Sequence, residues 1–460
     1  MSDWTLCIDF GTAFSKAAAA PSAAWSSFDP ASVRPIILNP DAGGNAFLLD
    51  SAVFVDDDRV LFGRAALARA AEINDKRRQA LRSFKTLLSV SDLERALNAN
   101  APATIDPHRV FQMRDLVVLY LAYLLAAIER GVANDTMIAN AAIAKRRYAA
   151  PAWRSGDSAG MHNTIVRLFG EAEAFRNAVG RRMLASEGIA LRTISEALPK
   201  ATQQAEPLDM GLIFEATAAA AYTSVGLEGA ASHLIVVDMG AGTTDIGAIA
   251  RLGSRTIELP EARVTLKQAG DFLDGVIANR VLDTASWARN AAQKSELWNV
   301  LMRQMGDIKE AVFMDGRAVL RNQGRSIAVS MREVEKDADF RDFLKSLRRA
   351  YDHALAVVRD DARARGRSEV HAVAVGGGAA SPFIRELIQR KAGSVRPRVT
   401  ARPATPQWAH VRTFEGNLAP VFPQLAIAIG GALAPDSMLA ASGGASRPAG
   451  GRSDTLAERD

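Results

Sequence analysis

Short apolar runs that end in an aspartate and a glycine occur at two distant places in the chain. Residues 6–12 read LCIDFGT, and residues 236–245 read VVDMGAGTTD. Each run has the length of a buried strand, and the glycines predict a tight turn into a second run of small and apolar residues, at 17–20 and at 246–250. The pattern therefore predicts two similar strand–turn–strand units, one in each half of the chain.

A third apolar run, VHAVAV at residues 370–375, precedes the glycines at 376–378. Ser381 and Pro382 follow, and a serine N-cap with proline at the first helical position is a typical helix start. We therefore predict a strand, a glycine turn and a helix. A flexible linker is the alternative interpretation, but linkers do not usually lie between an apolar strand and a capped amphipathic helix.

The longest apolar run covers residues 116–128 and is bounded by Asp115 and Glu129. It is shorter than the roughly 20 residues that a bilayer needs, so it predicts a buried helix, which we expect over 111–130. Two further short runs flank three aspartates and predict a β-hairpin over 53–62.

The composition is that of a multidomain globular protein. The chain has 460 residues, of which 48% are hydrophobic and 23% charged, enough for two or more domains. Its single cysteine, Cys7, excludes an intramolecular disulfide and is compatible with the reducing cytoplasm, where we expect the protein. No basic region and apolar stretch precede the first strand, so we expect neither secretion nor a membrane partner.

The net charge of +5 raises the question of nucleic acid binding. Basic clusters lie at 76–78, 145–147, 348–349 and 363–367. Acidic residues are interspersed, and no aromatic residues alternate with the basic ones as stacking platforms. We therefore interpret these clusters as solvated helix faces and expect no nucleic acid partner.

The two aspartate–glycine turns have the chemistry of a phosphate site. Glycine lets successive backbone N–H groups close around phosphate oxygens, and Thr12 and Thr243 add hydroxyl donors. Asp9 and Asp238 end buried strands, where a carboxylate needs a partner, and we predict that they hold Mg²⁺ through water. For either segment alone, an ordinary hairpin turn is the alternative.

In this order and at these separations, the three motifs resemble the phosphate-1, phosphate-2 and adenosine motifs of the actin-like ATPase superfamily. Residues 82–88 (RSFKTLL), 215–222 (EATAAAAY) and 270–274 (GDFLD) resemble segments of its DnaK-type heat-shock chaperone (Hsp70-like) branch. The resemblance covers about residues 5–433 and ends where the ATPase domain of that family ends. It therefore implies an ATPase domain without a substrate-binding domain.

The resemblance implies an α/β fold: a duplicated actin-like ATPase (ribonuclease H-like) fold with two lobes around a nucleotide cleft. Lobe I would cover 1–231, with an outer subdomain at about 35–107. Lobe II would cover 232–436, with an outer subdomain at about 268–341. Residues 437–460 belong to a Gly/Ser/Ala-rich stretch with too little apolar surface to fold, so we expect a disordered tail.

The resemblance also implies roles for individual residues around ATP or ADP and Mg²⁺. Lys85 would align the attacking water and offset negative charge, Glu215 and Asp245 would orient water, and Thr243 would contact the γ-phosphate or the water. The catalytic set is Lys85, Glu215, Asp238, Thr243 and Asp245. The nucleotide-binding set is Asp9, Gly11, Thr12, Ala13, Lys16, Gly240, Ala241, Gly242, Thr243, Gly270, Asp271, Lys309, Gly376, Gly377 and Gly378.

Lys16 departs from the chaperone branch. Actin and the plasmid-segregation actins carry a lysine at this offset from the first aspartate, where it approaches the phosphates, whereas DnaK-type proteins generally do not. An exposed strand position is the alternative for Lys16.

Other departures lie on the adenine side. Gly378 and Ala380 stand where the family has a serine and an adenine-stacking arginine, and Gly306 stands where it has a glutamate. We therefore expect weak or altered adenine contacts. The region that relays the nucleotide state to the peptide domain is also replaced, at 144–148, and the adjoining stretch at 149–170 has no predicted role.

These features predict a slow Mg-ATPase that acts as a nucleotide-dependent conformational switch on an unidentified protein partner. Two alternatives remain, a filament-forming bacterial actin-like protein and a small-molecule kinase of the same fold. The segments around Lys85 and Glu215 match the chaperone branch better than the filament formers. Against the kinase alternative, the sequence offers no clear candidate for the aspartate base that such enzymes place in the cleft.

Overall fold

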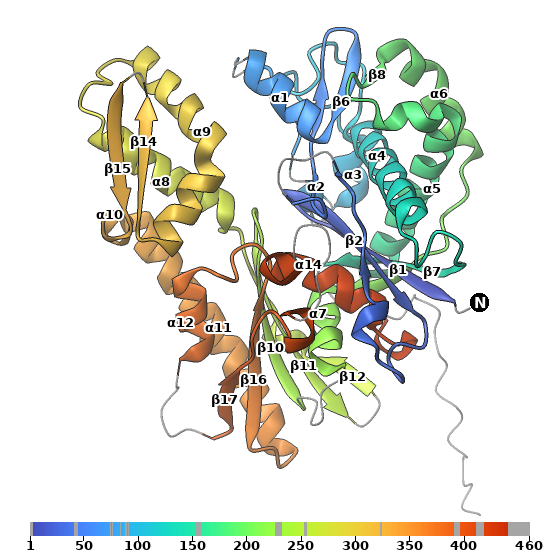
Figure 1. Cartoon of the computed structure of the whole chain (residues 1–460), viewed down its shortest axis with the longest axis vertical. Helices are drawn as coiled ribbons and strands as arrows, with labels where there is room; N and C mark the ends of the chain where they lie inside the picture. The colour runs from blue at the N-terminus through green and yellow to red at the C-terminus, as the bar shows by residue number, and fades with distance from the viewer. Residues whose placement is uncertain are drawn as a thin grey trace, which may run out of the picture.

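Figure 1 shows the fold of the chain in a computed structural model. The structure describes residues 3–40, 45–73, 75, 77–82, 84–87, 90, 92–151, 158–225, 232–252, 255–322, 324–390, 396–410 and 418–439. The fold is mixed α/β, as predicted.

Two six-stranded mixed sheets form the centre of the molecule. The first has the order β3-β2-β1-β7-β9, with β4 beside β2, and the second has the order β12-β11-β10-β16-β17, with β13 beside β11. The strands of the first sheet are β1 (Trp4–Phe10), β2 (Phe14–Pro21), β3 (Arg34–Pro35), β4 (Leu49–Asp50), β7 (Ile143–Ala150) and β9 (Gly211–Phe214). Those of the second are β10 (His233–Met239), β11 (Thr244–Leu252), β12 (Arg255–Glu258), β13 (Val264–Leu266), β16 (Glu369–Val375) and β17 (Arg398–Ala401).

The two sheets repeat the same strand directions. In each, the first strand along the chain pairs antiparallel with the second and parallel with the fifth, and the fifth pairs parallel with the sixth. The register places Asp9 opposite Lys16 in one sheet and Asp238 opposite Asp245 in the other. The predicted pair of strand–turn–strand units is therefore present, and equivalent positions carry an aspartate in both.

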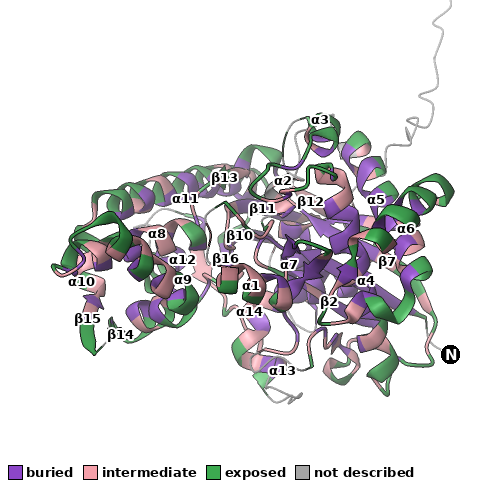
Figure 2. Ribbon diagram, turned by 90° about the horizontal axis from the view of Figure 1, so that it is seen from above, coloured by how far each residue is buried: buried purple, intermediate pink, exposed green. Residues whose placement is uncertain are grey.

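The central strands are apolar on both faces because each borders two cores. In β1, Leu6 and Ile8 enter the core of the first half, whereas Cys7 enters a core shared by both sheets. In β10, Ile235 and Val237 enter the core of the second half, and Leu234 and Val236 enter the shared one. The period of two along a strand explains this division. Figure 2 shows the buried residues concentrated at this centre.

Two helices, α7 (Glu215–Ser224) and α14 (Leu418–Leu433), fill the shared core. They approach closely because α14 carries glycine at the crossing. A Cβ on Gly430 would overlap the carbonyl oxygen of Ala218 in α7, and one on Gly431 would overlap the Cys7 sulfur. The two sheets are therefore joined through a tight helix pair.

Other long helices lie on the outer sides of the two sheets. α4 (Met113–Asn134) and α5 (Ser158–Val179) pack in the core of the first half, and α6 (Leu191–Gln204) lies beside α5. In the second half, α11 (Ala338–Ala364) and α12 (Pro382–Gln389) pack beside β16. The helix predicted to start at Pro382, with Ser381 as its N-cap residue, is confirmed.

The predicted buried helix is confirmed as α4, although it begins and ends later than expected. It is long and apolar enough to cross a membrane by length and composition alone, but 72% of its most apolar stretch is buried inside the molecule. Such burial is typical of a core helix.

Two smaller groups of elements project beyond the sheets, at the top of Figure 1. The first holds the predicted hairpin, β5 (Val53–Val55) and β6 (Arg59–Phe62), with α1 (Gly63–Ile73), α2 (Phe84–Leu87) and α3 (Leu93–Asn98). The strand β8 (Ile189–Ala190) pairs with β6. This group therefore includes residues far beyond 107, the expected end of the outer subdomain. The second group holds α8 (Gly270–Thr284), α9 (Ala291–Met314), the hairpin β14 (Arg317–Asn322) and β15 (Arg325–Ser330), and α10 (Met331–Lys336).

Two segments of unassigned role lie partly outside the described residues. In the stretch at 149–170, the structure describes the end of β7 and the first part of α5 but not 152–157. Near the C-terminus, a short 3₁₀ helix covers Asp436–Met438, and Met438 is buried. Ordered structure thus extends into the expected tail as far as Leu439, and residues 440–460 lie outside the description.

Candidate functional site

The turn between β1 and β2 has no room for a side chain at Gly11. A Cβ there would overlap the carbonyl oxygen of Phe14 and lie 3.1 Å from Nζ of Lys16. Nζ of Lys16 donates to Oδ2 of Asp9 at 2.7 Å, and the Lys16 side chain is only 14% exposed. Lys16 thus lies inside the turn beside Asp9, so the alternative of an exposed strand residue is wrong. Ser51 supports the turn by donating to the carbonyl oxygen of Gly11 at 3.0 Å.

The turn between β10 and β11 is closed by a hydrogen bond from the Gly240 N–H to the carbonyl oxygen of Thr243, at 3.0 Å. Asp245 accepts from two hydroxyls, Thr243 Oγ1 at 2.7 Å and Thr265 Oγ1 at 2.6 Å. These bonds orient the Asp245 carboxylate toward the turn. Thr243 and Asp245, which both belong to the predicted catalytic set, are in direct contact.

The N-terminus of α8 is attached to this second turn. The N–H of Gly270 donates to the carbonyl oxygen of Gly240 at 3.2 Å, and that of Asp271 donates to Ala241 at 2.8 Å. Lys309, from α9, pairs with Asp274 at 2.7 Å, and its Nζ lies 3.4 Å from the carbonyl oxygen of Gly270. The predicted nucleotide-binding residues of the second half therefore lie together.

The glycine turn after β16 packs against the end of β10. Gly376 has a φ of +82°, and a Cβ on it would overlap Oδ1 of Asp238 and lie 2.6 Å from the carbonyl oxygen of Met239. The Gly378 N–H donates to the same carbonyl at 2.9 Å. Glycine is needed at 376 for both its conformation and this close approach. The second and third sequence motifs thus meet at Asp238.

Lys85 reaches the centre of the molecule from α2. Its Nζ lies 2.7 Å from Oε1 of Glu215, the first residue of α7, and the two side chains are only 13% and 5% exposed. The neighbouring Phe84 ring stacks on Tyr120 of α4, with 4.7 Å between ring centroids, which fixes the direction of α2. A lysine and a glutamate 130 positions apart in the chain thus form a buried ion pair.

The buried charges around this pair perturb each other. Burial opposes the charge of Lys85, but Glu215, Asp238, Asp245 and Asp9 together hold the pKa of its ammonium above the usual range. Burial raises the pKa of Glu215 to about 8, which Lys85 counteracts and the nearby carboxylates reinforce. Burial also raises the pKa of Asp238 to about 6, with the same opposing influence of Lys85. Clusters of perturbed groups of this kind are typical of functional sites.

The charge balance of the cluster fits a divalent cation held through water. Its carboxylates are Asp9, Glu215, Asp238 and Asp245, and its ammonium groups are Lys16 and Lys85. Above about pH 8, where Glu215 is ionised as well, four carboxylates and two ammonium groups leave two negative charges uncompensated. Among the described residues, no three His, Cys, Asp or Glu side chains are grouped closely enough to bind a metal directly. Mg²⁺, which usually keeps several waters, suits such a donor set.

The structure therefore brings together the predicted residues of both turns, the Lys85 and Glu215 pair and the third glycine turn. Sequence reasoning missed three supporting residues: Ser51, Thr265 and Asp274. Thr265 and Asp274 lie close in sequence to predicted residues, but Ser51 carries no sequence signal, because only the fold places it under the first turn. At Gly306, where the resemblance leads us to expect a glutamate, an added Cβ would meet no atom within 4 Å.

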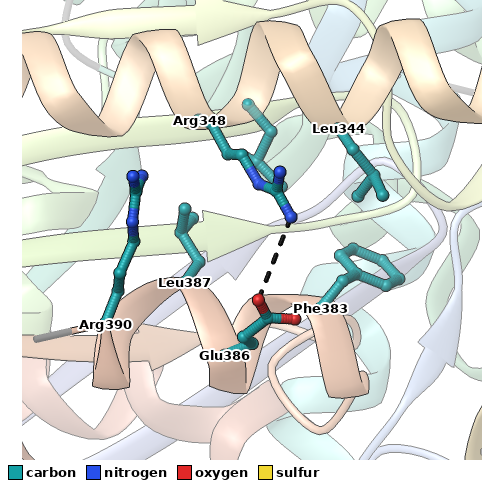
Figure 3. Close-up of a pocket in the computed structure, with 7 residues that line it drawn as sticks. Leu344, Arg348, Phe383, Glu386, Leu387 and Arg390 are labelled. Carbon is teal, nitrogen blue, oxygen red and sulfur yellow. Dashed lines mark ion pairs between the residues drawn. The ribbon is translucent and has the colours of Figure 1, made fainter.

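A separate small cavity lies between α11 and α12 (Figure 3). Its volume is about 170 Å³, and Leu344, Phe383 and Leu387 line it. Arg348 and Glu386 face each other across it at 3.9 Å, and Arg390 lies 3.5 Å from Asp352. Its charged groups are thus near partners within the fold, and none of the predicted site residues lines it.

Comparison of the chain with known protein families and with curated proteins found no match.

Proposed function

We propose that the chain has the duplicated actin-like ATPase fold and is an Hsp70-like protein that binds Mg-ATP between its two halves. The repeated strand order of the two sheets supports this fold. Asp9, Asp238 and Gly376 all lie at the ends of central strands, and this common position supports a nucleotide cleft. The observation that carries the proposal is the buried Lys85–Glu215 ion pair, which lies within electrostatic reach of Asp9, Asp238 and Asp245.

The first two turns hold the phosphates in this proposal. The Gly11 and Thr12 backbone contacts them from one side, and residues 240–243 contact them from the other. Lys16, which pairs with Asp9, would move its ammonium group to a phosphate oxygen when the nucleotide binds. Asp9 and Asp238 would then be the residues that hold Mg²⁺ through water. Mg²⁺, when bound, neutralises negative charge on the β- and γ-phosphates.

Lys85 and Glu215 carry the hydrolytic step in this proposal. The Lys85 ammonium, which stays protonated because of the surrounding carboxylates, offsets charge at the γ-phosphate and aligns the attacking water. Glu215 fixes Lys85 and accepts a hydrogen bond from the water. Thr243 and Asp245 orient the water from the opposite turn. We expect hydrolysis to be slow, and the nucleotide state to act on an unidentified protein partner.

Phosphate release from Mg-ATP tests the role of Lys85. We expect Lys85→Ala to reduce the rate by about 10²-fold or more, the loss typical of removing one preorganised electrostatic group. Lys200→Ala is the matched control, because Lys200 is an exposed lysine on α6. Equal rates in the wild type and Lys85→Ala would refute the proposed role.

A filament-forming actin relative is the second candidate, and the position of Lys16 favours it. Lys16 lies against Asp9 and Gly11 inside the first turn, where the resemblance places the phosphate-contacting lysine of actins. Nucleotide-dependent light scattering separates the two functions, since only the filament former should scatter more with Mg-ATP. A product screen with labelled ATP would detect a small-molecule kinase.

A further inference from the structure

A second cavity lies between the two projecting groups of elements. Its volume is about 730 Å³, within the range of small-molecule pockets. α1 and the segments before and after it form one wall, and α9 forms the other. These two helices face each other at the top of Figure 1. None of the residues predicted to bind the nucleotide lines this cavity, although Phe14 directly follows the first turn and Arg82 acts electrostatically on Asp274.

Three arginines line the cavity: Arg64 and Arg82 from the first half and Arg303 from the second. All three are exposed, and none makes a hydrogen bond or ion pair with another residue of the described chain. Elsewhere in the molecule, arginine side chains are commonly engaged with carboxylates, as Arg69 is with Asp56. Guanidinium groups that have no hydrogen-bonded acceptor among the described residues, placed around one cavity, favour an anionic ligand.

A fourth donor at this cavity also lacks an acceptor. Nδ2 of Asn45 is buried and has no hydrogen-bond partner among the described residues, although Oδ1 of the same side chain accepts from the Phe47 N–H. An unmet buried donor is costly, so its presence in the lining is a second, independent indication of a polar ligand.

Two carboxylates in the lining limit how much positive charge is available. Asp75 is already paired with Arg77, at 3.1 Å. Burial raises the pKa of Asp50 above its usual range, and the nearby Arg64 and Arg82 counteract part of this effect. The cavity therefore retains an excess of positive charge and of hydrogen-bond donors.

Apart from Asn39 and Asn299, the rest of the lining is apolar and comes from both halves. Phe14 and Met302, which are 37% and 36% exposed, are among the few large apolar side chains that reach solvent in the described chain. Leu67 and three alanines of α1 complete this surface. An aromatic ring and a flexible thioether are suited to contact a planar or apolar group.

We propose that the cavity between α1 and α9 binds a small organic phosphate that carries a planar or apolar group. A phosphate monoester, with up to two charges and three acceptor oxygens, matches several arginines better than a carboxylate does. The site does not depend on the proposed function, because it shares no residue with the nucleotide cleft.

Isothermal titration calorimetry with phenyl phosphate tests the proposal on the full chain. We expect saturable binding to the wild type, and about tenfold or more weaker binding for Arg303→Ala and for Arg64→Ala, the effect of one charge-assisted hydrogen bond. Arg321→Ala is the matched control, because Arg321 is an exposed arginine of β14 away from the cavity. Circular dichroism verifies that each variant is folded.

Four results would overturn the proposal: no saturable binding, unchanged affinity in both cavity variants, equal or tighter binding of benzoate, or displacement of phenyl phosphate by Mg-ADP. The last would show that the probe occupies the nucleotide cleft instead. Phenyl phosphate binding without any ATP hydrolysis would refute the proposed function and leave this site standing.

Discussion

At the scale of single residues, Glu215 is the carboxyl whose protonation is most closely coupled to folding. Burial raises its pKa from an ordinary 4.5 to about 8, even though Lys85 lies 2.7 Å away. Between these values the folded protein retains a proton that the unfolded chain has released. The free energy of unfolding of the ligand-free protein should therefore be highest below about pH 4.5 as far as this group is concerned, and fall as the pH rises toward about 8.

Urea denaturation at about pH 5 and about pH 8 measures this dependence. Glu215→Gln should flatten the loss of stability but not abolish it, because the pKa of Asp238 is also raised, to about 6. Glu335→Gln, at an exposed position of α10, should leave the slope unchanged. A wild type whose stability rises over this interval, or a variant with the full slope, would contradict the role assigned to Glu215.

Gly376 offers a second test at a single position. Gly376→Ala places a Cβ against the Asp238 carboxylate in a backbone conformation with positive φ, so it should weaken Mg-ADP binding as well as stability. Gly366→Ala is matched to it, because Gly366 also has a positive φ, +66°, but a Cβ there meets no atom within 4 Å. Fluorescent nucleotide titration should show weaker binding only for Gly376→Ala. Equal affinity in both variants would mean that Asp238 takes no part in binding.

At the scale of elements, the crossing of α7 and α14 is a tight junction between the two halves. Gly430→Ala would drive a Cβ into the carbonyl oxygen of Ala218, and the backbone cannot yield as a side chain would. We expect a loss of about 1–3 kcal/mol or more in the free energy of unfolding, the usual cost of overpacking.

Gly275→Ala provides the matched control on α8, where a Cβ would meet no atom within 4 Å. Alanine has the higher helix propensity, so this variant should gain up to about 1 kcal/mol. Chemical denaturation measures both. If Gly430→Ala were as stable as Gly275→Ala, α7 and α14 would not be in contact as described.

At the scale of the whole molecule, the site is assembled from two sheets. Ligand binding should therefore stabilise both of them. Mg-ADP at about 100 times its dissociation constant should stabilise the protein by about 2.7 kcal/mol. Hydrogen exchange should slow in the β1–β2 turn and in the β10–β11 turn together, because each contributes to one phosphate site in the proposed function. Protection confined to one turn would argue against a cleft between the halves.

Much of the local structure could be predicted from the sequence. The strand at 370–375, the helix start at Ser381 and Pro382, the hairpin at 53–62 and the buried helix α4 all follow from short-range patterns of apolar residues, glycines and caps. The same patterns identified Asp9 and Asp238 as candidate site residues, because an aspartate at the end of an apolar run stands out in the sequence whatever the fold.

Only the tertiary structure decided which distant residues meet. The sequence by itself determined the chemistry of the two turns, since glycine, aspartate and threonine act through their local backbone and side-chain atoms. It did not determine that Lys16 lies on Asp9, that Ser51 supports Gly11 or that β8 joins β6, because these contacts depend on strand register and on long-range packing. The cavity between α1 and α9 belongs to the same class: its arginines are unremarkable in sequence, and it exists only because the two halves of the chain face each other.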